Sequence, residues 1–126
     1  MKRLWIATAI LFLILFGTLY NSFYLSQLID GYELRLNAAH ELAKQGAWHN
    51  AGQLTRQVLQ DWEKRSFYLH VLLQHANIDN INLSFQEVLE YLSIQEADQY
   101  TAANARLITQ LGLLAEAELL TLRNIL

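Results

Sequence analysis

The first part of the chain is almost continuously apolar. Residues 4–25 read LWIATAILFLILFGTLYNSFYL and contain no charged side chain. As a helix this segment would rise roughly 33 Å, about the thickness of the hydrocarbon core of a bilayer. Trp5 at one end and Tyr20 and Tyr24 at the other suit the two membrane interfaces. The pattern predicts a transmembrane helix that contacts the lipid bilayer through residues 4–25; a cleaved signal peptide is the weaker alternative, since no good cleavage site follows.

From residue 25 onward the apolar positions recur every three or four residues, which is typical of helices with one buried face. The first such helix, which can continue directly from the anchor, is predicted to stop at Gly46. A short turn there makes it the antiparallel neighbour of a second helix over about residues 47–76. The predicted inward-facing residues of the two helices are Leu25, Ile29, Tyr32, Leu36, Ala39, Ala43, Trp48, Ala51, Thr55, Val58, Trp62, Leu69, Leu72 and Ala76.

The stretch NIDNINLS, residues 77–84, interrupts this periodicity and predicts a helix junction. Asp79, Asn80 or Ser84 is suited to cap a third helix that ends near Ser93. A fourth helix is predicted from about residue 96, followed by an apolar tail that docks as a final turn or short helix. The predicted inward-facing residues of the third and fourth helices are Phe85, Val88, Leu89, Leu92, Ala103, Leu107, Leu111 and Leu114.

These elements together predict an all-α protein. Residues 1–25 form a cytoplasmic stub and transmembrane anchor, and residues 26–126 form an extracytoplasmic antiparallel bundle of about four helices. A W-x-x-A pattern after the first turn is echoed by Y-x-x-A after the second. This gives the hairpins a weak likeness to tetratricopeptide pairs, but the full repeat signature is missing.

The charge distribution predicts the orientation of the chain. Lys2 and Arg3 precede the apolar segment, whereas all twelve acidic residues follow residue 25. Because basic residues stay on the cytoplasmic side, we expect a cytoplasmic N-terminus and a body outside the cell or spore membrane. An acidic body argues against nucleic-acid binding, which needs a basic footprint. With no cysteine, the chain has no disulfide and no thiolate metal site.

His75 and Asp79 are the strongest candidates for chemistry. They stand four residues apart and would share one face of a continuous helix, whereas His70 would point about 140° away from His75. A first-row metal needs three or four converging ligands, and a triad needs a nucleophile. A polar pair that fixes a helix junction is therefore the favoured interpretation of His75 and Asp79. The sequence predicts no catalytic residue, no cofactor and no enzyme.

Four stretches carry a resemblance to a known family: GAWHNA, LQDW, LLQHANIDNI and the closing LTLRNIL. With the apolar start, they resemble a domain-of-unknown-function family (DUF4363-like) of small single-pass membrane proteins from endospore-forming Gram-positive bacteria. The resemblance implies a cell or spore membrane and a multi-pass membrane protein as partner. It assigns no role to the residues that match best, which are Trp48, Ala51, Trp62, His75, Ile78, Asp79, Asn124, Ile125 and Leu126.

The sequence is therefore compatible with three functions. The favoured one is a membrane-tethered helical interaction module that docks on a multi-pass membrane protein. The first alternative is a metal-binding sensor or enzyme centred on His75 and Asp79. The second is a scaffold whose apolar C-terminal tail makes it a homo-oligomer, through Leu119, Leu120, Leu122, Ile125 and Leu126.

Overall fold

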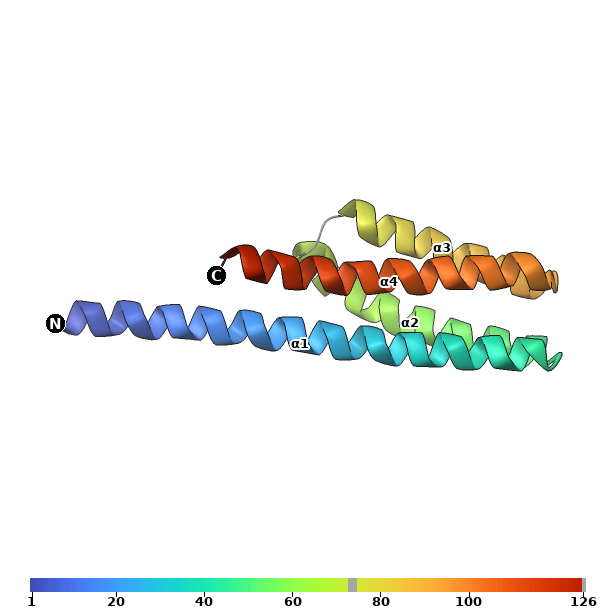
Figure 1. The fold of residues 1–126 in the computed structure, drawn as a ribbon, viewed down its shortest axis with the longest axis horizontal. Helices are drawn as coiled ribbons and strands as arrows, with labels where there is room; N and C mark the ends of the chain where they lie inside the picture. Colours follow the sequence, from blue (N-terminus) through green and yellow to red (C-terminus); the bar gives the residue numbers. More distant parts are fainter. Residues whose placement is uncertain (73–74, 126) are drawn as a thin grey trace.

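The computed structural model describes the backbone of residues 1–72 and 75–125, and the side chains of these residues except 18, 21–22, 66–72, 75–77 and 118–125. This part of the chain is helical apart from short turns (Figure 1). The helices are α1 (Lys2–Lys44), α2 (Trp48–Leu72), α3 (His75–Ser93) and α4 (Ala97–Ile125). The prediction of an all-α protein is confirmed for the described residues.

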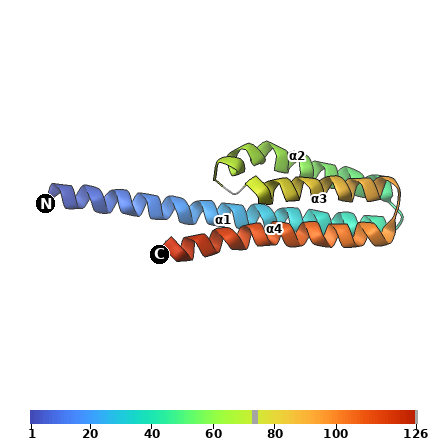
Figure 2. The same cartoon turned by 90° about the horizontal axis from the view of Figure 1, so that it is seen from above.

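The four helices close into an antiparallel bundle. α1 packs against α2 and α4, and α3 packs against the same two helices. Figure 2 shows the α1–α2 and α3–α4 turns together at one end of the bundle. The likeness to tetratricopeptide pairs is wrong as a guide to packing, because the long apolar face of α4 returns to α1 and closes a ring instead of extending a stack.

The core lies along the bundle axis and is built from the periodic apolar positions. Every predicted inward residue of α1 is buried, as are Ala51, Thr55, Val58 and Trp62 of α2. Leu69, Leu72 and Ala76 lie outside the described side chains, and Trp48 is half-buried. The α3 and α4 members of the core are Ile78, Ile81, Phe85, Val88, Leu92, Tyr100, Ala103, Leu107, Leu111 and Leu114.

α1 is one continuous helix of 43 residues. At 1.5 Å per residue it is about 65 Å long. Its C-terminal half belongs to the bundle from Leu25 onward, where the first buried side chain lies. Only the first part of α1 projects beyond the other helices, because the last turns of α4 run beside the part that follows (Figures 1 and 2). The sequence left open whether the apolar segment continues into the first periodic helix, and in the structure the two form one helix.

The two turns at the far end of the bundle share one backbone design. At the first, Gly46 has φ 84°. The Gly46 and Ala47 N–H groups donate to the Ala43 and Leu42 carbonyls, which is a Schellman motif that satisfies the end of α1. At the second turn, Gln95 has φ 57°, and the Gln95 and Glu96 N–H groups bond the ends of α3 in the same way. Glycine suits this left-handed conformation and glutamine does not.

The start of α3 differs from the prediction. The helix begins at His75, so Asp79, Asn80 and Ser84 lie inside it and none of them caps it. The apolar residues Ile78, Ile81 and Phe85 recur at helical spacing through the polar stretch and are fully buried. Their burial against the bundle outweighs the low helix propensity of the intervening asparagines and aspartate.

Candidate functional site

The N-terminal half of α1 is apolar on all sides, and only its later turns have another helix, the end of α4, beside them (Figures 1 and 2). Its large side chains are exposed in every direction, including Trp5 at 80%, Leu11 at 67% and Phe16 at 65%. A helix that is apolar all round needs an apolar environment on all sides. Within the described residues, however, no helix meets the combined requirement of length and apolarity for crossing a membrane.

A polar network joins α1 and α2 where the bundle begins. The Tyr32 hydroxyl, from a fully buried residue, donates a 2.5 Å hydrogen bond to Asp61 Oδ2. Arg65 Nε lies 3.3 Å from the same oxygen, and an Arg35 guanidinium nitrogen lies 3.9 Å away. The Arg65 guanidinium also lies 5.5 Å from the centre of the Tyr24 ring. The network therefore ties the last turn of the exposed apolar segment to the bundle.

The pKa of Tyr32 reflects this environment. Burial raises it above the ordinary value for a phenol, and the hydrogen bond to Asp61 and the charge of Asp61 raise it further, while Arg35 opposes them. The phenol therefore stays protonated at any physiological pH. It acts as a fixed donor that holds α2 in register on α1, and not as an acid or base.

Two further hydrogen bonds connect neighbouring helices. The indole Nε1–H of the fully buried Trp62 donates to Asn82 Oδ1 at 2.7 Å, joining α2 to α3. The Ser84 hydroxyl bonds Gln110 Oε1 at 2.5 Å, joining α3 to α4. Because a buried donor without a partner costs stability, these pairs favour one register of the bundle over its neighbours.

A second polar cluster lies between α1 and α4 and is incompletely paired. The Tyr100 ring lies 5.7 Å from the His40 ring, and Asn104 Nδ2 donates a long 3.4 Å bond to the Leu36 carbonyl. His40 Nδ1, the Tyr100 hydroxyl and Asn104 Oδ1 are buried without a hydrogen-bond partner. Burial raises the pKa of Tyr100 to about 12. Since neither hydroxyl nor amide ionises near neutral pH, this cluster lacks the groups for acid–base catalysis apart from His40.

His75 and Asp79 are both placed on α3, in its first two turns. Asp79 is exposed, and the His75 and His70 side chains lie outside the described residues. Among the described side chains, no group of three or more histidines and carboxylates could hold a metal ion. Because α3 runs unbroken from His75 to Ser93, the helix junction predicted at residues 77–84 is wrong. The pairing of His75 with Asp79 stays a prediction, since the His75 side chain lies outside the described residues.

The other residues of the predicted motif are mainly core residues. Trp62, Ala51 and Ile78 are fully buried. Trp48 is half-buried, and its ring meets the Tyr100 ring edge-on at 6.2 Å. The expected apolar tail continues α4 as far as Ile125, and the side chains of Asn124, Ile125 and Leu126 lie outside the described residues.

The comparison with protein families decides the identity of the bundle. The profile of a family described as a domain of unknown function, DUF4363, matches residues 19–125. The chain belongs to the DUF4363 family. The matched region of this DUF4363 chain covers the bundle and begins in the last turns of the exposed apolar segment of α1. Comparisons with curated proteins and with solved structures gave no match.

Sequence periodicity gave no indication of the polar contacts between helices. Asp61 is not among the predicted inward-facing residues of the second helix, and Asn82 and Gln110 belong to no motif. Their partners are 20 to 29 residues away along the chain. The only available signal was the inward position of Tyr32 and Trp62, because a buried hydroxyl or indole N–H requires a partner.

Proposed function

We propose that this DUF4363 chain is a membrane-tethered interaction module. In this proposal the exposed apolar half of α1 is embedded in the cell or spore membrane of a Gram-positive bacterium, and the bundle stands outside it. The observation that carries the proposal is the uncovered apolar surface of α1, since soluble monomers rarely expose apolar patches of more than a few hundred Å².

The length of the apolar segment of α1 determines how it would lie in a bilayer. The uninterrupted apolar run, residues 4–20, rises about 26 Å, somewhat less than a bilayer core of about 30 Å. The full length of about 30 Å is reached only by continuing past Asn21 and Ser22 to Phe23. Leu25 is already buried in the bundle, so the bundle would begin directly at the membrane surface with no linker. Lys2 and Arg3 before the run favour a cytoplasmic N-terminus.

A rigid connection of this kind suits a module that docks on a neighbour in the same membrane. Because α1 is one helix through both parts, insertion of its apolar half would fix the position of the bundle relative to the bilayer. The Tyr24–Arg65–Asp61–Tyr32 network strengthens the point where the two parts meet. A bundle held at a fixed height and orientation supports the proposal of a multi-pass membrane protein as partner.

Membrane tethering is tested by paired substitutions on α1 and the bundle. Arginine at Ile10 and Leu11 together would raise the free energy of insertion by about 6 kcal/mol, taking about 3 kcal/mol for each arginine near the centre of the helix. The control places arginine at Leu34 and Leu83, which are also exposed leucines, at 75% and 68%, but lie on the bundle. Both double variants add the same charge to the chain.

After extraction of membranes with alkaline carbonate, we expect the wild type and the L34R/L83R control to stay in the membrane pellet. The I10R/L11R variant should move to the supernatant. Wild-type protein in the supernatant, or the same distribution for both double variants, would contradict the tether.

The partner is tested separately by mild crosslinking in native membranes. We expect the full-length chain to be recovered with one multi-pass membrane protein. Recovery of the chain only as a monomer would refute docking, and recovery only as a covalent homo-oligomer would favour the scaffold alternative.

A further inference from the structure

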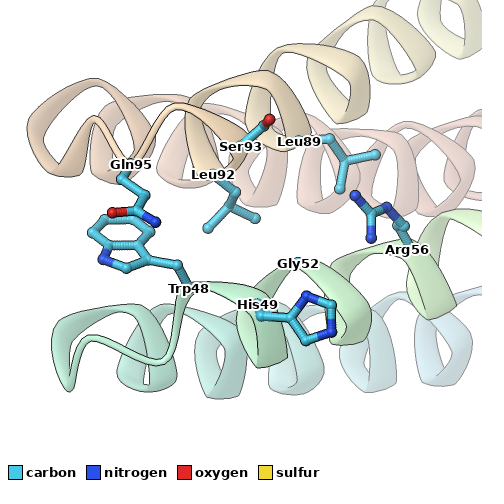
Figure 3. A pocket seen from close by; sticks show the side chains of 8 residues that line it. All are labelled: Trp48, His49, Gly52, Arg56, Leu89, Leu92, Ser93 and Gln95. Atoms are coloured by element: carbon cyan, nitrogen blue, oxygen red, sulfur yellow. The ribbon is translucent and has the colours of Figure 1, made fainter.

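A small pocket lies at the end of the bundle that carries the two turns. Its volume is about 250 Å³, and it lies between the start of α2 and the end of α3 (Figure 3). The residues that line it from α2 are Trp48, His49, Gly52 and Arg56. Ser93 lines it from the end of α3, and Gln95 lines it from the turn that follows. Leu89 and Leu92 add an apolar wall. The pocket opens to solvent, since His49, Arg56, Ser93 and Gln95 are exposed.

Arg56 gives the pocket its charge. The other arginines whose side chains are described in the bundle are paired: Arg35 and Arg65 with Asp61, and Arg106 with Glu87. Arg56 has no carboxylate partner among the described residues, although the body of the chain has more acidic than basic residues. His49 lies at the same rim (Figure 3). An unpaired guanidinium is suited to a carboxylate, which it binds through paired hydrogen bonds.

Two pocket residues are also poor choices for their backbone positions. Gly52 lies inside α2, where alanine would be more stable by about 1 kcal/mol, and a Cβ at this position would meet nothing within 4 Å. Gln95 holds a left-handed conformation that the equivalent first turn gives to Gly46. Neither choice is explained by packing. Residues that oppose the backbone preference of their position, and gain no packing contact in return, are expected at functional sites.

We propose that this pocket binds the carboxylate of an acidic side chain on a protein partner. Arg56 holds the carboxylate, and the missing side chain at Gly52 lets the stem of the partner residue approach the α2 backbone. Trp48 and Leu92 contact the stem, and the Gln95 amide offers a donor at the rim. The volume is below the 300–1,000 Å³ usual for drug-sized ligands, which favours a single side chain over a free metabolite.

The site is tested by titrating the full-length protein, in neutral detergent micelles, with three probes. The first is a tripeptide with blocked ends and a central glutamate, the second is the same peptide with glutamine, and the third is free glutarate. The readout is the NMR signal of the Trp48 indole N–H, assigned against the two other tryptophans of the chain, Trp5 and Trp62. We expect saturable shifts with the glutamate peptide at millimolar concentration and at least tenfold weaker binding of the glutamine peptide.

Two pairs of variants complete the test. R56M should weaken binding of the glutamate peptide about tenfold, whereas R106M, which removes an exposed arginine elsewhere, should leave it unchanged. G52A should raise the melting temperature and weaken binding, because its methyl group occupies the pocket. G31A is the control, since Gly31 is also a helical glycine with nothing within 4 Å of an added Cβ and lies away from the pocket.

Three results would overturn the proposal. The first is equal binding of the glutamate and glutamine peptides, and the second is unchanged binding in R56M. The third is the absence of a saturable shift up to about 50 mM peptide, which corresponds to a binding free energy weaker than about 2 kcal/mol. Tighter binding of glutarate than of the glutamate peptide would assign the pocket to a small acid and refute a protein partner. None of these results depends on whether the apolar half of α1 enters a membrane.

Discussion

The two buried tyrosines of the bundle should respond in opposite directions to the same substitution. Tyr32 is fully buried and its hydroxyl donates to Asp61 at 2.5 Å. Tyr100 is equally inaccessible, but its hydroxyl has no partner. Replacing either tyrosine with phenylalanine removes one oxygen and leaves the ring packing in place. The difference between Y32F and Y100F therefore isolates the value of the hydrogen bond.

The expected sizes follow from the surroundings of each hydroxyl. A hydrogen bond to a charged group contributes about 1.5–3 kcal/mol. Asp61 keeps Arg65 at 3.3 Å and its side chain is 30% exposed, so the lower end applies and Y32F should lose about 1.5 kcal/mol. In Y100F a buried unpaired hydroxyl disappears, which should add up to about 1 kcal/mol. For a bundle of this size these changes correspond to a fall of about 5 °C and a rise of about 3 °C in melting temperature.

The assay is thermal unfolding of the full-length protein in neutral detergent, followed by far-UV circular dichroism at 222 nm, where helices absorb. Wild type and both variants must be measured in the same detergent, because the detergent also contributes to stability. A change of the same sign in Y32F and Y100F would refute the assignment of one paired and one unpaired hydroxyl. A larger fall in melting temperature in Y100F than in Y32F would also refute this assignment.

Three further predictions concern pH, the two turns and the predicted polar pair. The pKa values of Tyr32 and Tyr100 are higher in the folded protein than in the unfolded chain. The free energy of unfolding should therefore keep its full value below about pH 10 and fall as the pH rises to 12 and above. Denaturant unfolding at pH 8, 10 and 11.5 measures this profile, and a flat profile would contradict it. G46A should lower the free energy of unfolding by about 1 kcal/mol and Q95G should raise it by about the same amount, since both positions are left-handed. If denaturant melts show that G46A and Q95G change the free energy of unfolding in the same direction, the two turns do not share the preference for glycine. D79A should change stability by less than about 0.5 kcal/mol because Asp79 is exposed; a loss above 1 kcal/mol would restore a structural role for this residue.

The helical fold was readable from the sequence because each helix buries one continuous face. Residues such as Leu36, Val58 and Leu107 recur at three- and four-residue spacing, and each is fully buried. The end of α1 was equally readable, because Gly46 is the residue that a left-handed helix stop prefers. Where one residue decides a local conformation, the sequence is enough to predict it.

The remaining features depend on contacts between helices. The start of α3 was placed too late because asparagine and aspartate at positions 77–80 resemble a cap, whereas burial of Ile78 and Ile81 holds these residues in a helix. The second turn ends at Gln95, whose side chain gives no sign of a left-handed conformation. The pocket at Arg56 joins residues about 40 positions apart, and no local pattern predicts which arginine of a bundle lacks a partner.

In the proposed arrangement the bundle stands outside the membrane on an inserted α1. Labelling of introduced cysteines in intact cells, with a maleimide that cannot cross membranes, tests this arrangement. The native chain has no cysteine, so single substitutions at Lys2 and at the exposed Glu96 report each end without background. We expect E96C to be labelled in intact cells and K2C to be labelled only after the membrane is permeabilised. Labelling of K2C but not E96C in intact cells, or of neither until lysis, would contradict it.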